Sequence, residues 1–211
     1  SLAKLAPQAV DGIDSRRDAW IHWLQQEICQ SRDSERVVVF TEYVATLEAL
    51  VEAVNHHLPA LAGGVEAVHG QTGTALRRST LARFCSSDSE LSVLLCTDVL
   101  AEGLNLHHQA RYVFHYDLPW NPAVMQQRVG RLDRLGQGRP VSSFHFRSPA
   151  VEELRLHRRL EDKVSRIAGD IGPTVPLLSP LPRPDAPAPP TLFRIATTPA
   201  EDHGPAICVR T

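Results

Sequence analysis

Short apolar runs alternate along the chain with longer segments of helical period. The runs are rich in β-branched residues and predict buried strands at 37–40, 65–68, 91–96, 111–116 and 141–146. The intervening segments repeat apolar residues three and four positions apart, and predict helices at 15–29, 43–57, 74–85, 123–134 and 151–168. Strands joined through helices of this length form a parallel sheet with right-handed crossovers, so the fold class is α/β.

Polar residues follow these strands where each one ends. They are Thr41, His69-Gly70, Thr97-Asp98 and Asp117. In an open parallel sheet the working loops lie at the carboxyl ends of the strands. We therefore expect the functional residues at that edge.

Composition narrows the class of protein only slightly. The apolar fraction of 43% is typical of a globular chain, and the net charge of -2 gives no overall attraction to nucleic acid. The sequence contains no run of eighteen apolar residues, so we expect no membrane span, and no signal peptide is visible. The four cysteines form no CxxC pair, so we predict no metal site and a reducing, cytoplasmic location.

The last forty residues differ in character from the rest. Ten of the sixteen prolines lie between Pro173 and Pro205, which argues against a helix or a central strand there. We expect a lead-in and helix at 1–30, the main domain at 31–169, and a Pro-rich tail or linker at 170–211. Within the tail, Leu192–Ile195 is a candidate for a short docking segment.

Three arginines spaced three apart carry the clearest chemical signal. On a helix, Arg128, Arg131 and Arg134 would share one face, where they would repel each other unless an anion lay between them. Gly130 would let that face approach a ligand closely, and guanidinium forks match polyphosphate oxygens. The alternative is a solvated, Arg-rich helix face.

A second segment ends a buried strand with Thr97 and Asp98. A hydroxyl and free backbone amides at the start of a helix suit a phosphate of a nucleotide or a nucleic acid. Alternatively, Asp98 simply caps that helix.

Five segments in order, over residues 36 to about 147, resemble the closing motifs of superfamily 2 helicases of the Swi/Snf-related branch. They are Arg36–Tyr43 (motif IV), His69-Gly70 with Arg77 and Phe84, Leu95–Leu106 (motif V), Asp117–Pro122 (Asp-x-x-Trp-Asn-Pro) and Gln127–Gln137 (motif VI). Cys96 and Asp133 depart from common family residues, and motif VI looks closer to bacterial members, including the RNA-polymerase-associated type. The resemblance implies a RecA-like C-terminal helicase lobe.

The resemblance also implies roles for individual residues. Arg131 and Arg134 would be arginine fingers on the γ-phosphate of ATP. The expected nucleotide-side residues are Gln127, Arg128, Glu102, Gly103 and Asn105. The expected contacts to the nucleic-acid backbone are Thr41, His69, Gly70, Thr97 and Asp98. For His69 the alternative is a strand-end histidine satisfied by its own loop, and for Trp120 it is a core aromatic.

The sequence holds no Gly-Lys-Thr loop and no Asp-Glu pair for binding ATP with Mg²⁺. Its two lysines are Lys4 and Lys163, and neither follows a glycine. We therefore expect an N-terminal RecA-like lobe, elsewhere in the protein or on another chain, to bind most of the nucleotide. This chain alone is expected to hydrolyse no ATP.

The predicted function is that of one lobe of an ATP-dependent translocase. Its expected partners are the N-terminal lobe, the backbone of double-stranded DNA and a protein–DNA complex to be remodelled. Two alternatives remain open: a non-catalytic RecA-like module that binds nucleic acid or protein, and a strand-separating helicase of a neighbouring family.

Overall fold

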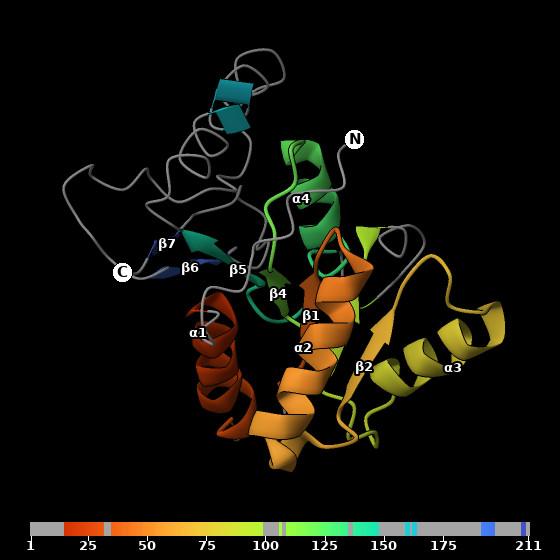
Figure 1. Cartoon of the computed structure of the whole chain (residues 1–211). Coiled ribbons are helices and arrows are strands. Elements are labelled where there is room, and N and C mark those ends of the chain that lie inside the picture. The colour runs from red at the N-terminus through yellow and green to blue at the C-terminus, as the bar shows by residue number, and fades with distance from the viewer. Residues whose placement is uncertain are drawn as a thin grey trace, which may run out of the picture.

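The computed structural model describes residues 15–31, 35–98, 106, 109–134, 137–147, 159–160, 162–163, 191–196 and 208–209. A sheet in the order β2-β3-β1-β4-β5-β6-β7 forms its centre (Figure 1). The first five strands are parallel: β1 (Val37–Phe40), β2 (Val65–Val68), β3 (Val93–Cys96), β4 (Tyr112–His115) and β5 (Ser142–Arg147). They confirm the five predicted strands and the α/β fold class.

Helices cover both faces of the sheet. On one face α1 (Ser15–Leu24) and α2 (Val44–His57) pack on the side chains of Val37, Val39 and Phe114. On the other face, α3 (Thr74–Cys85) and α4 (Pro122–Val129) contribute Phe84 and Val129 to a second apolar cluster. Alternate strand residues supply the two clusters, because side chains of a strand point in turn to opposite faces. Figure 1 shows α1 and α2 together in front of the sheet.

The strand register aligns the polar residues that follow each strand. Phe40 lies opposite both Cys96 and His115, and Val68 lies opposite Cys96. The next residues along the chain, Thr41, His69, Thr97 and Tyr116, therefore emerge at the same edge of the sheet. This is the carboxyl edge at which the sequence places the site.

The first helix is an integral part of this core. A π-helical turn, Gln25–Cys29, continues α1 without a break, so the helical segment spans the predicted 15–29. Trp23 is buried with ring centroids 5.0 Å from Phe114 and 4.7 Å from Phe144, and Trp20 packs edge-on against Tyr116. The indoles thus seal one face of β4 and β5.

The helix that carries motif VI is shorter than predicted. Asn121 caps it by accepting a hydrogen bond from Ala123 N, but α4 ends at Val129 and not at Arg134. Gly130 N still donates to the carbonyl oxygen of Gln126, but the next two amides, of Arg131 and Leu132, donate to carbonyl oxygens only three positions earlier, so tighter turns follow the helix. Those turns bring Leu132, which is fully buried, onto the sheet. Glycine lowers helix stability, and burial of Leu132 favours the turn.

The Pro-rich tail adds two strands to the sheet. β6 (Thr191–Ala196) pairs antiparallel with β5, and β7 (Cys208–Val209) pairs antiparallel with β6. The docking segment predicted at Leu192–Ile195 is therefore a strand. Of the helix predicted at 151–168, only residues 159–160 and 162–163 lie within the described part of the chain, and they are helical. The domain limits at 30 and 169 stay a prediction.

None of the helices within the described residues has both the length and the apolar character that crossing a bilayer demands.

Candidate functional site

Arg128 lies at the centre of the carboxyl edge and is completely buried. Its side chain is 0% exposed and forms a two-pronged ion pair with Asp98: Nε to Oδ1 at 2.6 Å and Nη2 to Oδ2 at 2.8 Å. Nη1 lies 3.3 Å from both His115 Nδ1 and the carbonyl oxygen of Asp117, and the guanidinium lies over the Phe40 ring. Bidentate Arg–carboxylate pairs are among the strongest hydrogen-bonded contacts in proteins. Arg128 therefore ties α4 to the loop after β3.

This geometry corrects the prediction of three arginines on one face. Because α4 ends at Val129, only Arg128 is helical, and it points into the protein. Arg131 is half-buried in the following turn, and Arg134 is exposed, with its Nε donating to the Gly130 carbonyl at 3.0 Å. Gln127 is exposed on α4. The described contacts of Arg128 are internal, whereas Arg131 and Arg134 form no ion pair with any described residue.

Two buried polar atoms at this edge have no partner among the described residues. They are Nε of Arg131 and the hydroxyl oxygen of Thr97. A buried donor without an acceptor is costly, typically about 1–3 kcal/mol, so such groups usually meet a ligand or water. A ligand or a water molecule that reached either atom would satisfy it.

Thr41 does not face outward as predicted. It is buried, and its hydroxyl donates to the carboxylate of Asp117 while accepting a hydrogen bond from Tyr43 N at 3.3 Å. The hydroxyl therefore joins the end of β1 to the end of β4. A contact between this side chain and a nucleic-acid backbone would require that bond to break.

The half-buried His69 and the exposed Gly70 form a turn after β2. Thr72 closes the turn, because its hydroxyl accepts from His69 N and its amide donates to the His69 carbonyl, both at 3.0 Å. His69 Nδ1 accepts from Gln71 N at 3.3 Å, which places the ring proton on Nε2. Gly70 is exposed at the tip of the turn. The loop itself thus satisfies one nitrogen of His69, and the other is a donor.

The predicted nucleotide-side residues Glu102, Gly103 and Asn105 lie outside the described residues.

Trp120 is 59% exposed, so the interpretation of this residue as a core aromatic is wrong. Tyr43, at the start of α2, and Leu76, in the first turn of α3, are also large and exposed. All three follow the carboxyl end of a strand. This edge therefore presents apolar as well as polar side chains to the outside.

The profile of the family described as "Helicase conserved C-terminal domain" matches residues 20–136, more than half of the chain. The chain belongs to this family. The match confirms the resemblance to the C-terminal lobe of superfamily 2 helicases.

Its relatives include the RNA polymerase-associated protein RapA of two Vibrio species. That of Vibrio atlanticus is 32% identical over 139 residues, and that of Vibrio campbellii is 30% identical over 139 residues. Each alignment covers 64% of this chain and 14% of the relative. The helicase lobe thus corresponds to about one seventh of a much longer protein.

Solved structures with the same fold are helicase lobes as well. The C-terminal part of the Fun30 ATPase domain superposes with a TM-score of 0.57 at 20% identity, covering 69% of this chain and 44% of that one. Domain 2 of the DEAD-box helicase Mss116p, bound to an RNA duplex, gives a TM-score of 0.58 at 24% identity, with 70% and 54% covered. These likenesses show that the fold is that of RecA-like helicase lobes.

Sequence reasoning missed a buried polar cluster behind Arg128. His115 of β4 and Ser143 and His145 of β5 are all buried, and His115 Nε2 lies 3.0 Å from Ser143 Oγ. Burial, followed by the charges of Arg128 and His145, holds the pKa of His115 well below its usual range. A signal was present, since histidines and paired serines are unusual in strands buried on both faces.

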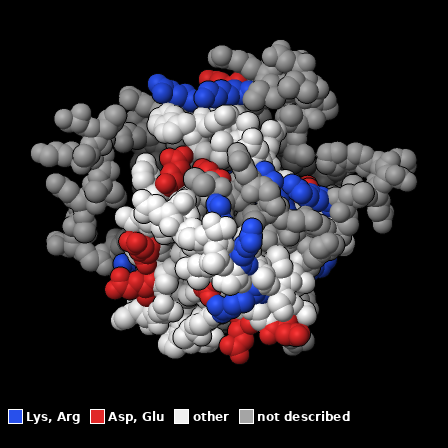
Figure 2. Space-filling model, turned by 90° about the vertical axis from the view of Figure 1, so that its right-hand side faces the viewer, with Lys and Arg blue, Asp and Glu red and all other residues white. Residues whose placement is uncertain are grey.

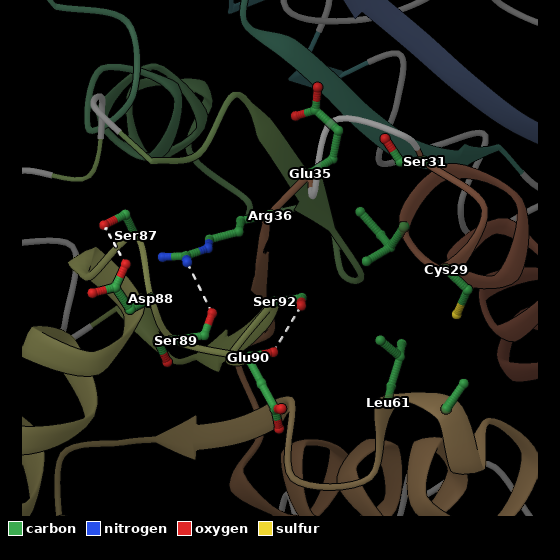
Figure 3. A pocket seen from close by; sticks show the side chains of 12 residues that line it. Cys29, Ser31, Glu35, Arg36, Leu61, Ser87, Asp88, Ser89, Glu90 and Ser92 are labelled. Atoms are coloured by element: carbon green, nitrogen blue, oxygen red, sulfur yellow. Dashed lines mark hydrogen bonds between the residues drawn. The ribbon is translucent and has the colours of Figure 1, made fainter.

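A pocket lies at the opposite, amino edge of the helicase lobe. It measures about 400 Å³, and its lining comes from the end of the first helix and from the segments that precede β1, β2 and β3 (Figure 3). Arg36 points across it and donates to the carbonyl oxygens of Ser86 and Ser89 at 2.6 and 3.0 Å. The pocket therefore includes the first residue of motif IV, Arg36, but lies at the opposite edge of the sheet from the Arg128–Asp98 pair.

Charge on the side of the helicase lobe that carries α3 is divided. Lys and Arg side chains run along the top of this side and through its middle, whereas Asp and Glu occupy mainly the bottom and left (Figure 2). Because the charges are divided in this way, any attraction for a phosphate backbone is confined to part of this surface.

Among the described residues, no group of three His, Cys, Asp or Glu side chains could hold a metal ion.

Proposed function

We propose that this chain is the C-terminal lobe of an ATP-driven translocase that moves along duplex nucleic acid. The observation that carries the proposal is the contrast among the motif VI arginines: Arg128 is committed to Asp98, whereas Arg131 and Arg134 have no described acidic partner. Two guanidiniums without an acidic partner among the described residues, three and six positions after the Arg128 that pairs with Asp98, suit the γ-phosphate of a nucleotide held by a second lobe.

In this proposal, Arg131 and Arg134 stabilise the charge that spreads over the transferred phosphoryl group. ATP and its Mg²⁺ are bound mainly by the N-terminal lobe. The buried, unpartnered Nε of Arg131 fits an anion, which supports this role. Gln127, exposed one turn before Arg131, and the motif V residues Glu102, Gly103 and Asn105 complete the nucleotide side of the interface.

Arg128 takes a coupling role in place of a direct phosphate contact. Its ion pair joins motif VI on α4 to Asp98 in motif V. Asp98 follows Thr97, whose unpartnered hydroxyl suits a backbone phosphate. The pair therefore links a nucleotide-side segment to a nucleic-acid-side segment without touching either ligand.

The nucleic-acid side comprises Thr97, His69 and Gly70, which share the carboxyl edge of the sheet. The Nε2–H of His69 and the exposed backbone at Gly70 are suited to phosphate oxygens and read no base. Binding should therefore depend little on sequence and strongly on salt. The name of the RapA relatives suggests a transcription complex as the protein–DNA assembly to be remodelled.

The test uses a polypeptide that contains this chain together with its N-terminal lobe. Replacing Arg131 with Ala or Lys is expected to lower DNA-stimulated ATP turnover by about 10³-fold, because an arginine finger contributes about that much or more. Lys should not rescue, since it lacks the planar fork. The matched control is Arg83→Ala. It removes a surface ion pair between Arg83, in the last turn of α3, and Glu66, and it should leave turnover within about twofold.

Unchanged turnover in Arg131→Ala would overturn the catalytic proposal and favour a non-catalytic RecA-like module. A translocation assay run beside an unwinding assay on the same duplex separates a translocase from a strand-separating helicase. Strand separation at the rate of ATP turnover would contradict the translocase proposal.

A further inference from the structure

A buried polar row crosses the sheet directly beneath Arg128. His115 and His145 lie opposite each other on β4 and β5, and Ser143 lies opposite Val113, one pair earlier along the same face. That face is the one covered by α4, because Val113 belongs to the same apolar cluster as Val129. The row therefore connects the sheet to motif VI.

The protonation of His115 follows from its two contacts. The nitrogens of a guanidinium can only donate, so His115 Nδ1, 3.3 Å from Arg128 Nη1, must accept. The single ring proton of the neutral imidazole is then on Nε2 and is donated to Ser143 Oγ at 3.0 Å. Protonation of Nδ1 would turn this attraction into a clash between two donors and two positive charges. Arg128 thus fixes the tautomer, and Ser143 Oγ supplies the acceptor for the Nε2 proton.

The contact with His115 restrains the orientation of the Arg128 guanidinium, which the ion pair with Asp98 alone does not fix. Asp98 holds Nε and Nη2, which are on one side of the guanidinium, and the Phe40 ring lies against its plane. The opposite nitrogen, Nη1, is held by His115 and by the Asp117 carbonyl. Without an acceptor on His115, the guanidinium plane can pivot about Asp98 and leaves a buried N–H unsatisfied.

We propose that His115, oriented by Ser143, is a positioning residue that fixes the guanidinium plane of Arg128 and so fixes α4 relative to the loop that carries Asp98. Its consequence for ATP-driven movement rests on the proposed function. The placement of Arg128 itself does not, because every contact involved lies within this chain.

Two substitutions of similar size separate positioning from simple filling of the core. His115→Asn places its amide oxygen near the position of Nδ1 and can accept from Arg128. His115→Gln carries its amide out to the position of Nε2, near Ser143, and leaves Arg128 Nη1 without that acceptor. Both replace a buried ring with a smaller amide, so a purely structural role predicts similar losses.

The readout is the NMR signal of the Arg128 Nε–H group in the 211-residue chain, assigned by its disappearance in Arg128→Lys. We expect a sharp signal with slow exchange against water in the wild type and in His115→Asn. In His115→Gln, exchange of the Arg128 Nε–H proton with water should be at least about tenfold faster, because the buried ion pair would open more often. An unchanged signal in His115→Gln, or equal changes in both variants, would overturn the proposal.

A second measurement does not depend on either variant folding. The ring ¹⁵N pattern of His115 in the wild-type chain should be that of the Nε2–H tautomer, and Arg128→Met, which removes the donor to Nδ1, should mix the two tautomers. A wild-type ring protonated on Nδ1 would refute the proposal. In the two-lobe protein, His115→Gln should lower DNA-stimulated turnover several-fold and Asn should restore most of it. If Arg131→Ala has no effect while the NMR results hold, the proposed function fails and the positioning role stands.

Discussion

At the scale of single residues, the site is built around a cation that is buried more deeply than its anion. Arg128 is 0% exposed, whereas the side chain of Asp98 is 37% exposed. Breaking a buried ion pair is expensive mainly because one charge is left without compensation. The cost therefore depends on which partner remains.

This asymmetry predicts different stabilities for two variants. Asp98→Ala leaves the guanidinium buried and unpaired, and should lower the free energy of unfolding by about 3–5 kcal/mol. Arg128→Met fills the same space and leaves a carboxylate that water can reach, so it should cost less, about 1–2 kcal/mol. Chemical denaturation measures both, with the exposed-pair variant Arg83→Ala as control. A larger loss in Arg128→Met than in Asp98→Ala would contradict this account.

His115 makes stability depend on pH. The groups that face it are Arg128 from α4, which is paired with Asp98, and His145 and Ser143 from β5. Because the pKa of His115 is depressed in the fold, the unfolded chain binds more protons once the pH falls below about 6.5. The free energy of unfolding should therefore fall with pH below that point, by at most about 1.4 kcal/mol per pH unit for this group.

The difference between variants isolates that contribution. His115→Asn has no ring to protonate, so its stability should fall less between pH 7 and pH 5 than that of the wild type. Thermal unfolding at both pH values measures this loss of stability. The other nine histidines are present in both proteins, so their contributions cancel when the variant is subtracted from the wild type. His57→Asn, at an exposed position, should retain the full slope. An equally steep fall in His115→Asn would show that this histidine is not held neutral.

At the scale of elements, α1 packs into the core of the sheet. Its two tryptophans fill one face of the sheet against Tyr116, Phe114 and Phe144. The helix is therefore expected to fold with the sheet and not as a separate lead-in.

A pair of tryptophan variants tests this point. Trp23→Ala empties a buried site between α1 and the strands and should cost about 3–5 kcal/mol of unfolding free energy. Trp120→Ala removes the same side chain from an exposed position and should change stability by about 0.5 kcal/mol or less. Denaturation curves compare them directly. Similar losses would mean that α1 contributes little to the core.

The elements also show what could be predicted from sequence. The five parallel strands and the start of α4 were predictable, because β-branched runs and the Asn121-Pro122 cap are local signals. The end of α4 was not, since it depends on Leu132 reaching an apolar cluster built by distant strands. The inward turn of Arg128 was hidden for the same reason: its partners, Asp98 and His115, are thirty and thirteen residues away. Spacing along one helix cannot reveal them.

At the scale of the whole molecule, the two edges of the sheet have different characters. The carboxyl edge gathers unpartnered polar atoms and exposed Tyr43 and Trp120. At the amino edge, Arg36 and Glu35 are buried, with Arg36 bonded to nearby carbonyl oxygens and Glu35 accepting from Arg111 and Arg139. Most of these groups at the amino edge are bonded within the chain, although Glu35 Oε2 has no partner among the described residues. The exposed aromatic side chains and open polar atoms at the carboxyl edge agree better with the proposed contact to a second lobe.

This difference between the two edges predicts that the isolated chain hydrolyses no ATP. In the proposed function the 211 residues supply donors to a phosphate, but they contain no Gly-Lys-Thr loop to hold ATP and Mg²⁺. Phosphate release by the isolated chain should therefore equal that of its Arg131→Ala variant, with or without duplex DNA, while the two-lobe protein is active. DNA-stimulated release that Arg131→Ala abolishes would show that this lobe holds a nucleotide unaided. Because two guanidiniums can stabilise a transition state only where another group holds the phosphate, equal background rates are what a half-site must give.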